Sequence, residues 1–597
     1  MKTYTISIYL MFAAILIADD DYKMPPKAIV DIVDAPKTPN ISISPNKKYV
    51  LFLGKPSLLS IKELSQPELR LAGIRINPAT NGRSRASTYN SIKLKNIKSG
   101  KEKKITGIPL NAAILQASWS PDENHIAIAV IVNEKISLYL AQTKSGRAKL
   151  LVNKALNTAY GRPMYWLSNS SGLIVKTVPS KRGPAPVKNT DPQGPVIQEN
   201  LGIVSPARTY QDLLSSPYDE DLFSYYMTSQ VLHVNLKGKV KKIGKPGVIK
   251  RAEPSPDGKF ILMETIHKPY SYLVPLYRFP TFIEVYDIDG SLIELLRDIP
   301  LAETIPIGRD AVMEGPRSFG WRSDVGSSIY YVTALDGGDP NVETSFRDEI
   351  FTIDAPFKGV SPKSLTKLDL RYAGVIWGND QFALVNARRW KERRLTTWRL
   401  NPNQRSSTKI MDRSYEDRYN DPGSPMMETN AFGRSVMALF EGSKVLMSGI
   451  GASPEGDMPF VDVFDLNTKK SSRLWRCEAP YYERAVTLFN KKHEDFLDVS
   501  ILNTILGDYF GSRLMKNIRE DKGYTYGIGS VISESGGSGY LLIGSEVGKE
   551  HLQPTLDEIK KAVSKKLSKH VKSSVISTVH EDFMLMLIDN LRTVKKK

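Results

Sequence analysis

The stretch Ser255-Pro-Asp-Gly258, followed directly by the apolar run Phe260-Ile-Leu-Met263, decides the fold of this 597-residue chain. Proline fixes φ at the second position of a turn, while Asp and Gly supply a side-chain hydrogen bond and a permissive backbone. The run behind the turn has the composition of a short strand. We therefore expect a hairpin corner at Ser255.

The same corner recurs along the chain. Copies begin at Ser44 and Ser120, and looser copies begin at Trp166, Trp321, Trp377 and Asn430. A second recurring element is a strand that ends in a polar turn, as at 94–100, 138–146, 285–290 and 463–468. Two hairpins per unit give about four strands per unit, which is the blade of a β-propeller. Seven corners predict seven blades, and eight blades are the alternative. The fold class is therefore mainly β.

One long insertion interrupts the repeats. Residues 179–208 are rich in Pro, Gly and polar residues and predict an excursion at a blade rim. Residues 209–226 have helical spacing, so we expect a helix on that rim.

Composition excludes several classes of protein. Hydrophobic residues make up 41% and charged residues 24%, which is typical of globular protein and excludes wholesale disorder and a polytopic membrane protein. The net charge is +18, but no zinc finger or other nucleic-acid motif accompanies it, so we expect no nucleic-acid partner. The single cysteine, Cys477, cannot form an intrachain disulfide, and its apolar neighbours predict a buried side chain.

The amino terminus has the pattern of a signal peptide. Lys2 precedes an apolar stretch from Ile6 to Ala18, which is short for a membrane span. We expect residues 1–18 to be removed and the protein to be periplasmic or secreted. An uncleaved anchor is the alternative. No other segment approaches twenty apolar residues, so we expect no integral membrane span after removal of the signal.

The repeat region resembles the propeller of a bacterial, glutamyl-endopeptidase-like branch of the prolyl oligopeptidase family. The resemblance rests on the strings at 65–73, 194–201, 207–214, 271–280, 416–423 and 478–484. It implies a propeller over residues 25–497. In that family the propeller covers the active site of an α/β-hydrolase domain that follows in the chain.

That hydrolase domain is not recognisable. About 100 residues follow Leu497, and they hold no Gly-x-Ser-x-Gly nucleophile motif, because Tyr540 stands where the second glycine of Gly536-Gly-Ser-Gly-Tyr540 belongs. We therefore name no catalytic residue.

The tail, residues 498–597, has a different pattern. Apolar residues at helical spacing predict a helix over 499–519, broken near Gly507 or Gly511. Residues 524–532 and 539–547 read as two strands, and 550–567 and 574–594 as two more helices. Together they predict a small α+β fragment.

The string 502–527 resembles the carboxy-terminal, non-metal-binding module of pitrilysin or insulinase-family zinc peptidases. In that family an arginine and a tyrosine seven positions later hold the substrate, which here implies Arg519 and Tyr526. A guanidinium fork binds a carbonyl or carboxylate, and a phenol donates to an oxyanion. The alternative is a surface arginine and a strand tyrosine. No two of the seven histidines lie four residues apart, so we expect no zinc site and no cofactor.

Three hypotheses follow from this sequence. The first is an exported, non-catalytic protein that binds a peptide or protein through its propeller. The second is a component of a peptidase assembly that works in trans with a zinc-peptidase subunit. The third is a truncated or fused remnant of a serine peptidase. The ligand, the oligomeric state and the independent folding of the tail stay open.

Overall fold

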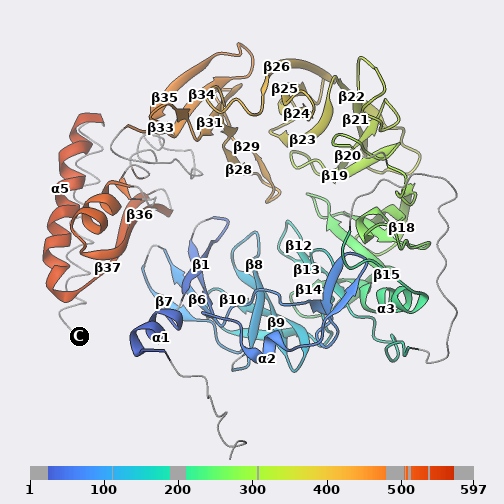
Figure 1. Cartoon of the computed structure of the whole chain (residues 1–597), viewed down its shortest axis with the longest axis horizontal. Coiled ribbons are helices and arrows are strands. Elements are labelled where there is room, and N and C mark those ends of the chain that lie inside the picture. The colour runs from blue at the N-terminus through green and yellow to red at the C-terminus, as the bar shows by residue number, and fades with distance from the viewer. Residues whose placement is uncertain are drawn as a thin grey trace, which may run out of the picture.

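The computed structural model shows a ring of antiparallel sheets and a smaller α+β unit (Figure 1). The residues described are 25–188, 210–305, 308–478, 512–535 and 538–570, apart from 36, 47, 98 and 111, together with 503, 506 and 507. The predicted signal peptide and the predicted helix over 574–594 lie outside these residues, as does most of the long insertion. In the described part no helix is long and apolar enough to span a bilayer.

Seven four-stranded units make the ring, as the repeats predict. The first sheet holds β1 (Lys37–Ile43), β2 (Tyr49–Lys55), β6 (Ser91–Asn96) and β7 (Glu102–Lys104). The second sheet holds β8 (Ala113–Trp119), β9 (His125–Val132), β10 (Lys135–Gln142) and β11 (Ala148–Val152). The third holds β12 (Met164–Trp166), β13 (Gly172–Thr177), β14 (Thr228–Asn235) and the first half of β15 (Val240–Pro254). The fourth holds the second half of β15 with β16 (Phe260–Ile266), β17 (Thr281–Asp287) and β18 (Leu292–Ile299).

The remaining three sheets follow the same order. The fifth holds β19 (Pro316–Trp321), β20 (Ser328–Ala334), β21 (Asp348–Asp354) and β22 (Lys363–Leu368). The sixth holds β23 (Arg371–Trp377), β24 (Ala383–Arg389), β25 (Arg394–Asn401) and β26 (Ser406–Ser414). The seventh holds β27 (Ser424–Pro425), β31 (Lys444–Gly449), β34 (Phe460–Asp465) and β35 (Ser471–Arg476), and β30 (Leu439–Phe440) pairs with β31.

The predicted corners lie between the first two strands of a sheet and share one hydrogen bond. The Oγ atoms of Ser44, Ser120 and Ser255 each accept from the backbone N–H five residues later, at 3.0 Å. The copy at Asn430 differs from this prediction. It turns an extra hairpin, β28 (Met427–Thr429) and β29 (Ser435–Met437), and the turn that leads into β31 lies at 441–443.

Apolar side chains fill the spaces between successive sheets. Leu51 and Leu94 of the first sheet pack against Ile126 and Ile128 of the second, and all four have almost no exposed surface. Similar clusters join each later sheet to the next, up to the sixth and seventh. Burial of these faces supplies the main stabilisation of the ring.

A second apolar layer is built from the loops between sheet strands. The small sheet β3 (Leu69–Leu71), β4 (Ile74–Asn77) and β5 (Gly82–Arg83) packs with helix α3 (Pro217–Met227) around Phe223. The helix predicted over 209–226 therefore starts later, because Ser216 caps it by accepting from Asp219 N–H and Pro217 stands in the first turn. Short helices α1 (Lys27–Val33), α2 (Ile61–Leu64) and η1 (Leu276–Arg278) and the pair β32 (Ala452–Ser453) and β33 (Gly456–Asp457) complete the elements of the ring.

The described part of the carboxy-terminal unit follows the predicted order of helix, hairpin and helix, but most of the helix predicted over 499–519 lies outside the described residues. A helical turn η2 (Met515–Asp521) of the π type precedes the hairpin β36 (Thr525–Ser535) and β37 (Ser538–Val547). The turn η3 (Lys549–His551) and helix α5 (Leu552–His570) follow. Leu514, Ile518, Ile528 and Ile559 form its small core, which joins the helices to one face of the hairpin.

Candidate functional site

Arg519 and Tyr526, the predicted substrate-binding pair, lie on successive elements of the carboxy-terminal unit. Arg519 stands in η2 and is partly buried. Tyr526 is the second residue of β36, and its side chain is 98% exposed. Thr525 explains this outward position, because its Oγ1 donates to Glu546 O at 2.6 Å and accepts from Gly527 N–H at 3.1 Å. The pairing of β36 with β37 shifts register between Thr525 and Ile528, so Tyr526 lies in this irregular part of the strand, next to the buried Thr525.

The helical turn that carries Arg519 is fixed to helix α5. Asn517 Nδ2 donates to Glu558 Oε2 at 2.9 Å, and Lys561 Nζ lies 3.0 Å from Glu558 Oε1. These hydrogen bonds, together with the charges of Lys522 and Lys561, lower the pKa of Glu558 to about 2. Glu558 therefore stays ionised at any physiological pH and holds the elements on either side of the hairpin together.

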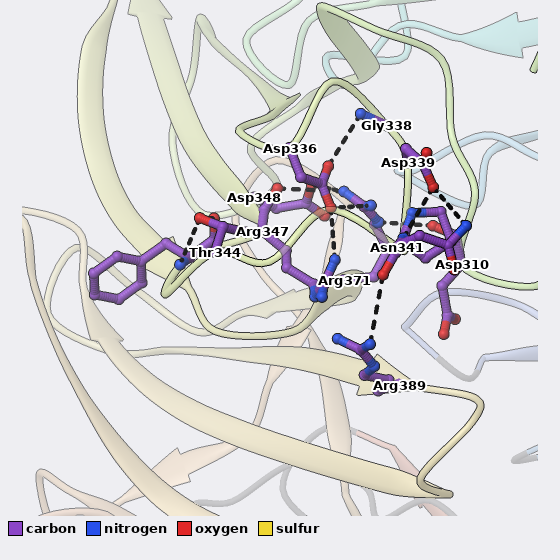
Figure 2. Close-up of polar contacts among 12 residues, drawn as sticks. Asp310, Asp336, Gly338, Asp339, Asn341, Thr344, Arg347, Asp348, Arg371 and Arg389 are labelled. Carbon is purple, nitrogen blue, oxygen red and sulfur yellow. Dashed lines mark hydrogen bonds and ion pairs between the residues drawn. The ribbon is translucent and has the colours of Figure 1, made fainter. Parts of the chain in front are cut away.

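Sequence reasoning missed a buried charged cluster between the fifth and sixth sheets (Figure 2). Asp348 Oδ2 lies 2.6 Å from Arg317 Nη2, and Asp348 Oδ1 lies 2.7 Å from Arg371 Nη1. Asp336 Oδ2 accepts from Arg371 at 2.7 Å and from Arg347 at 2.8 Å. All five residues are at most 8% exposed.

The environment of this cluster opposes the effect of burial on the pKa of Asp336 and of Arg371. Burial alone would raise the pKa of Asp336, but hydrogen bonds from Arg371, Gly338 and Arg347 outweigh burial and lower it. Burial lowers the pKa of Arg371, and the two aspartates outweigh that effect and raise it. For Arg317 burial prevails and the pKa is lowered, and its Nη1 has no hydrogen-bond partner among the described residues. Three arginines and two aspartates, all largely shielded from solvent, form an inter-sheet clamp.

The surrounding loops are attached to the clamp by backbone bonds. Arg371 Nε donates to Asp310 O at 2.9 Å, and Asp310 Oδ2 accepts from Trp390 N–H at 2.7 Å. Arg389 reaches Pro340 O in the loop before β21 (Figure 2). No spacing in the sequence marks these residues, because they come from several loops and strands between 310 and 390.

A row of tryptophan hydrogen bonds links the inner strands of successive sheets. Trp119 Nε1 donates to Ser42 Oγ at 3.1 Å, and Trp166 Nε1 donates to Ser118 O at 3.1 Å. Trp321 Nε1 donates to Glu253 O at 3.0 Å. Trp377 holds the same place in the sixth sheet, but its buried Nε1 has no partner within the described part of the chain. The tryptophans that begin the looser repeats are therefore inter-sheet contacts.

The described histidines are dispersed. His267 stacks on Phe282 with ring centroids 3.9 Å apart and bonds Asp298, and His551 stacks on Tyr524 at 4.8 Å. Across the described ranges, no three His, Cys, Asp or Glu side chains gather as a metal-binding group. Cys477, the one cysteine, is a buried free thiol as predicted.

Comparison with known proteins adds the peptidase relationship. Residues 461–577 match the family model described as the Peptidase M16 inactive domain. The chain is 42% identical over 506 residues to the "Probable glutamyl endopeptidase, chloroplastic" of Oryza sativa subsp. japonica, and 40% identical to the protein of the same name from Arabidopsis thaliana. These alignments cover 81% of this chain but 54% and 52% of the relatives, so the chain spans about half the length of the curated relatives it matches.

Two further matches concern the separate parts. The uncharacterized zinc protease YmxG of Bacillus subtilis (strain 168) is 30% identical over 133 residues, which is 22% of this chain and 32% of that protein. Among solved structures, a prolyl endopeptidase matches with a TM-score of 0.37 at 11% identity, over 77% of this chain and 53% of its own. The β-propeller domain of the Trilobed protease from Pyrococcus furiosus matches with a TM-score of 0.32 at 10% identity, over 74% and 96%.

The match to the M16 inactive domain begins inside β34, ahead of the predicted boundary at Leu497, which lies outside the described residues. The plant relatives support the glutamyl-endopeptidase resemblance, whereas its bacterial branch stays a prediction. The chain is thus similar to glutamyl endopeptidases over most of its length, and its last part matches the inactive domain of M16 peptidases.

Proposed function

We propose that this protein binds peptides without cleaving them, using surfaces inherited from two kinds of peptidase. The observation that carries the proposal is the exposed phenol of Tyr526 on a folded unit that matches an inactive peptidase domain. An aromatic side chain that is 98% exposed contributes nothing to the core and is available for contacts outside the unit.

The partner chemistry follows from the side chains. A phenol accepts or donates one hydrogen bond, and a guanidinium binds a peptide carbonyl or a carboxylate in a fork. Arg519 and Tyr526 flank the turn at 522–524, whose Tyr524 N–H donates to Ile518 O at 2.9 Å. A peptide laid along this turn would meet both side chains. The net charge of +18 favours peptides rich in acidic residues. The name of the glutamyl endopeptidase relatives suggests the same preference.

A second candidate is a non-metal component of a peptidase assembly. The match to the M16 inactive domain favours it, because a zinc-bearing subunit would then supply the chemistry. In the described sheet β37 pairs with β36 alone, which leaves one strand edge for a partner. The remnant hypothesis is the third candidate, and it predicts neither ligand nor partner. We place the mature protein outside the cytoplasm on the signal-peptide pattern of residues 1–18.

One experiment distinguishes peptide binding from peptide cleavage. The purified protein is titrated into fluorescein-labelled oxidised insulin B chain, and the same samples are analysed by mass spectrometry. Saturable binding that weakens in Tyr526→Ala, with intact peptide recovered, supports the proposal. Cleavage that a fluorophosphonate or a chelator abolishes would overturn it. Activity that appears only after an M16 zinc subunit is added identifies the assembly, and absence of both binding and assembly identifies the remnant.

A further inference from the structure

Among the described residues, no strand of the first sheet pairs with a strand of the seventh. Every strand of the first sheet comes from residues 37–104, and every described strand of the seventh comes from residues 424–476. Ser42 faces the second sheet, where it accepts from Trp119. Its neighbours Ile41 and Ile43 therefore point to the opposite face of the first sheet, and they are 63% and 44% exposed. Among the described residues no apolar cluster spans both sheets at this seam, although the seventh sheet has its own buried cluster of Met426, Leu446 and Val461.

The β28–β29 hairpin reaches across the ring instead. It leaves the seventh sheet and points into the middle of the ring (Figure 1). Arg434 Nη1 lies 2.9 Å from Glu253 Oε1 in β15, and Arg434 Nη2 also donates to Pro254 O. Asn430 Nδ2 donates to Ser323 O, at the end of β19, at 2.7 Å. The tip of the hairpin therefore bonds to the fourth and fifth sheets.

These contacts are built into the ring rather than formed by chance at its surface. The side chains of Arg434 and Glu253 are 25% and 20% exposed, so the pair is largely shielded from solvent. Arg251 lies 3.5 Å from the second oxygen of Glu253, which leaves that carboxylate held from two sides. At the other end of the hairpin, Val436 and Met437 are buried, and Met437 packs with Phe382 and Leu384 of the sixth sheet.

We infer that the β28–β29 hairpin is a strap that closes the ring across its diameter, in place of strand pairing at the seam. An open ring of stacked sheets hinges most easily where its two ends meet, because in the described part of the chain no hydrogen-bonded strand joins them there. A strap from the seventh sheet to the fourth and fifth fixes the last sheet relative to the far side and so limits that opening. Loss of Arg434 or of its carboxylate partner weakens the attachment of the tip, which then depends on the bond from Asn430 to Ser323 O, while every sheet keeps its own hydrogen bonds.

Distance measurement across the seam tests this strap. In a Cys477→Ser background, spin labels are placed on the full-length chain at Lys101→Cys in the first sheet and Lys470→Cys in the seventh, both exposed turn positions. The expected result is a distance distribution that broadens and moves to longer distances in Arg434→Ala. Arg418→Ala is the matched control, because Arg418 is 68% exposed and belongs to the same part of the chain.

A second variant keeps the test valid if the first variant does not fold. Glu253→Gln keeps the size of the side chain and removes only its charge, and it is expected to broaden the distribution as Arg434→Ala does. The double variant is expected to add little beyond Arg434→Ala, because Arg434→Ala already removes the ion pair with Glu253 together with the bond to Pro254 O. Distributions for Arg434→Ala and Glu253→Gln that coincide with the parent, in folded protein, would overturn the strap. Equal broadening in Arg418→Ala would overturn it as well.

Discussion

Asp348 Oδ1 lies 2.7 Å from Arg371 Nη1, and this pair joins the fifth sheet to the sixth with neither side chain exposed by more than 4%. The second oxygen of Asp348 accepts from Tyr372 N–H at 2.7 Å as well as from Arg317. One carboxylate thus forms ion pairs with two arginines and accepts from a backbone donor. The aspartate is consequently a structural requirement of this junction.

Replacing that aspartate is expected to weaken the ring. Asp348→Asn keeps the shape but leaves Arg317 and Arg371 short of a buried counter-charge, which costs about 3–5 kcal/mol when one partner of a buried pair is lost. Urea denaturation followed by tryptophan fluorescence measures the loss. Asp354→Asn is the control, since Asp354 pairs with Lys363 at a half-exposed site and its loss is expected to cost under about 1 kcal/mol. Equal costs for the two variants would refute the clamp.

The tryptophan row gives a matched pair of substitutions. Trp321→Phe removes the bond to Glu253 O and leaves a buried carbonyl without that donor. The lost bond is expected to lower the free energy of unfolding by about 1–3 kcal/mol, in addition to the effect of the smaller side chain. Trp377→Phe removes an Nε1 that has no partner in the described structure, so that additional cost is absent. Thermal denaturation of the two variants compares them, and a larger loss in Trp377→Phe would contradict the role assigned to these bonds.

Lys176 makes the stability of the ring depend on pH. Its side chain is 2% exposed, donates to Ile249 O at 3.1 Å and to Tyr160 O, and burial lowers its pKa to about 7. Between pH 7 and about pH 10 the unfolded chain carries this proton and the folded chain does not, so this residue makes stability rise with pH. The slope reaches about 1.4 kcal/mol per pH unit.

Lys176→Met is therefore expected to remove that slope. The difference in unfolding free energy between the parent and Lys176→Met should change steadily from pH 7 to pH 9, in favour of the parent as the pH rises. Below pH 7 the difference should stay constant, because both states of the parent are then protonated. Curves that run parallel from pH 6 to pH 9 would show that the buried amine titrates normally.

Tyr526 is expected to matter for binding and not for folding. Removal of an exposed side chain far from the core changes stability by less than about 0.5 kcal/mol. Tyr526→Phe deletes only the hydroxyl and is expected to weaken binding of labelled insulin B chain several-fold, while Arg519→Lys keeps the charge but loses the fork. Fluorescence anisotropy provides the affinities. Binding unchanged in Tyr526→Ala would assign the peptide to another surface.

The sequence predicts the ring well because its signals are local. The Ser-Pro-Asp corners at Ser120 and Ser255, the Ser-Pro-Asn corner at Ser44 and the polar turns after the third strands each depend on a few neighbouring residues, and the structure confirms them. The same holds for the hairpin of the tail, where the predicted 524–532 and 539–547 become β36 and β37.

What the sequence does not predict depends on contacts between distant residues. Arg434 and Glu253 are 181 residues apart, so nothing near Asn430 distinguishes a strap from an ordinary corner. The clamp likewise draws its arginines and aspartates from several loops and strands. Arg519 and Tyr526 were predicted by resemblance alone, and the structure gives their exposure while their role stays a prediction.

The most direct test of non-cleaving peptide binding is one incubation read in two ways. Fluorescein-labelled oxidised insulin B chain is mixed with excess purified full-length protein, its anisotropy is recorded, and its mass is measured after prolonged incubation. The expected result is a saturable rise in anisotropy, reduced in Tyr526→Ala, with the peptide mass unchanged. Shortened peptide whose formation stops with a fluorophosphonate or a chelator would contradict the account.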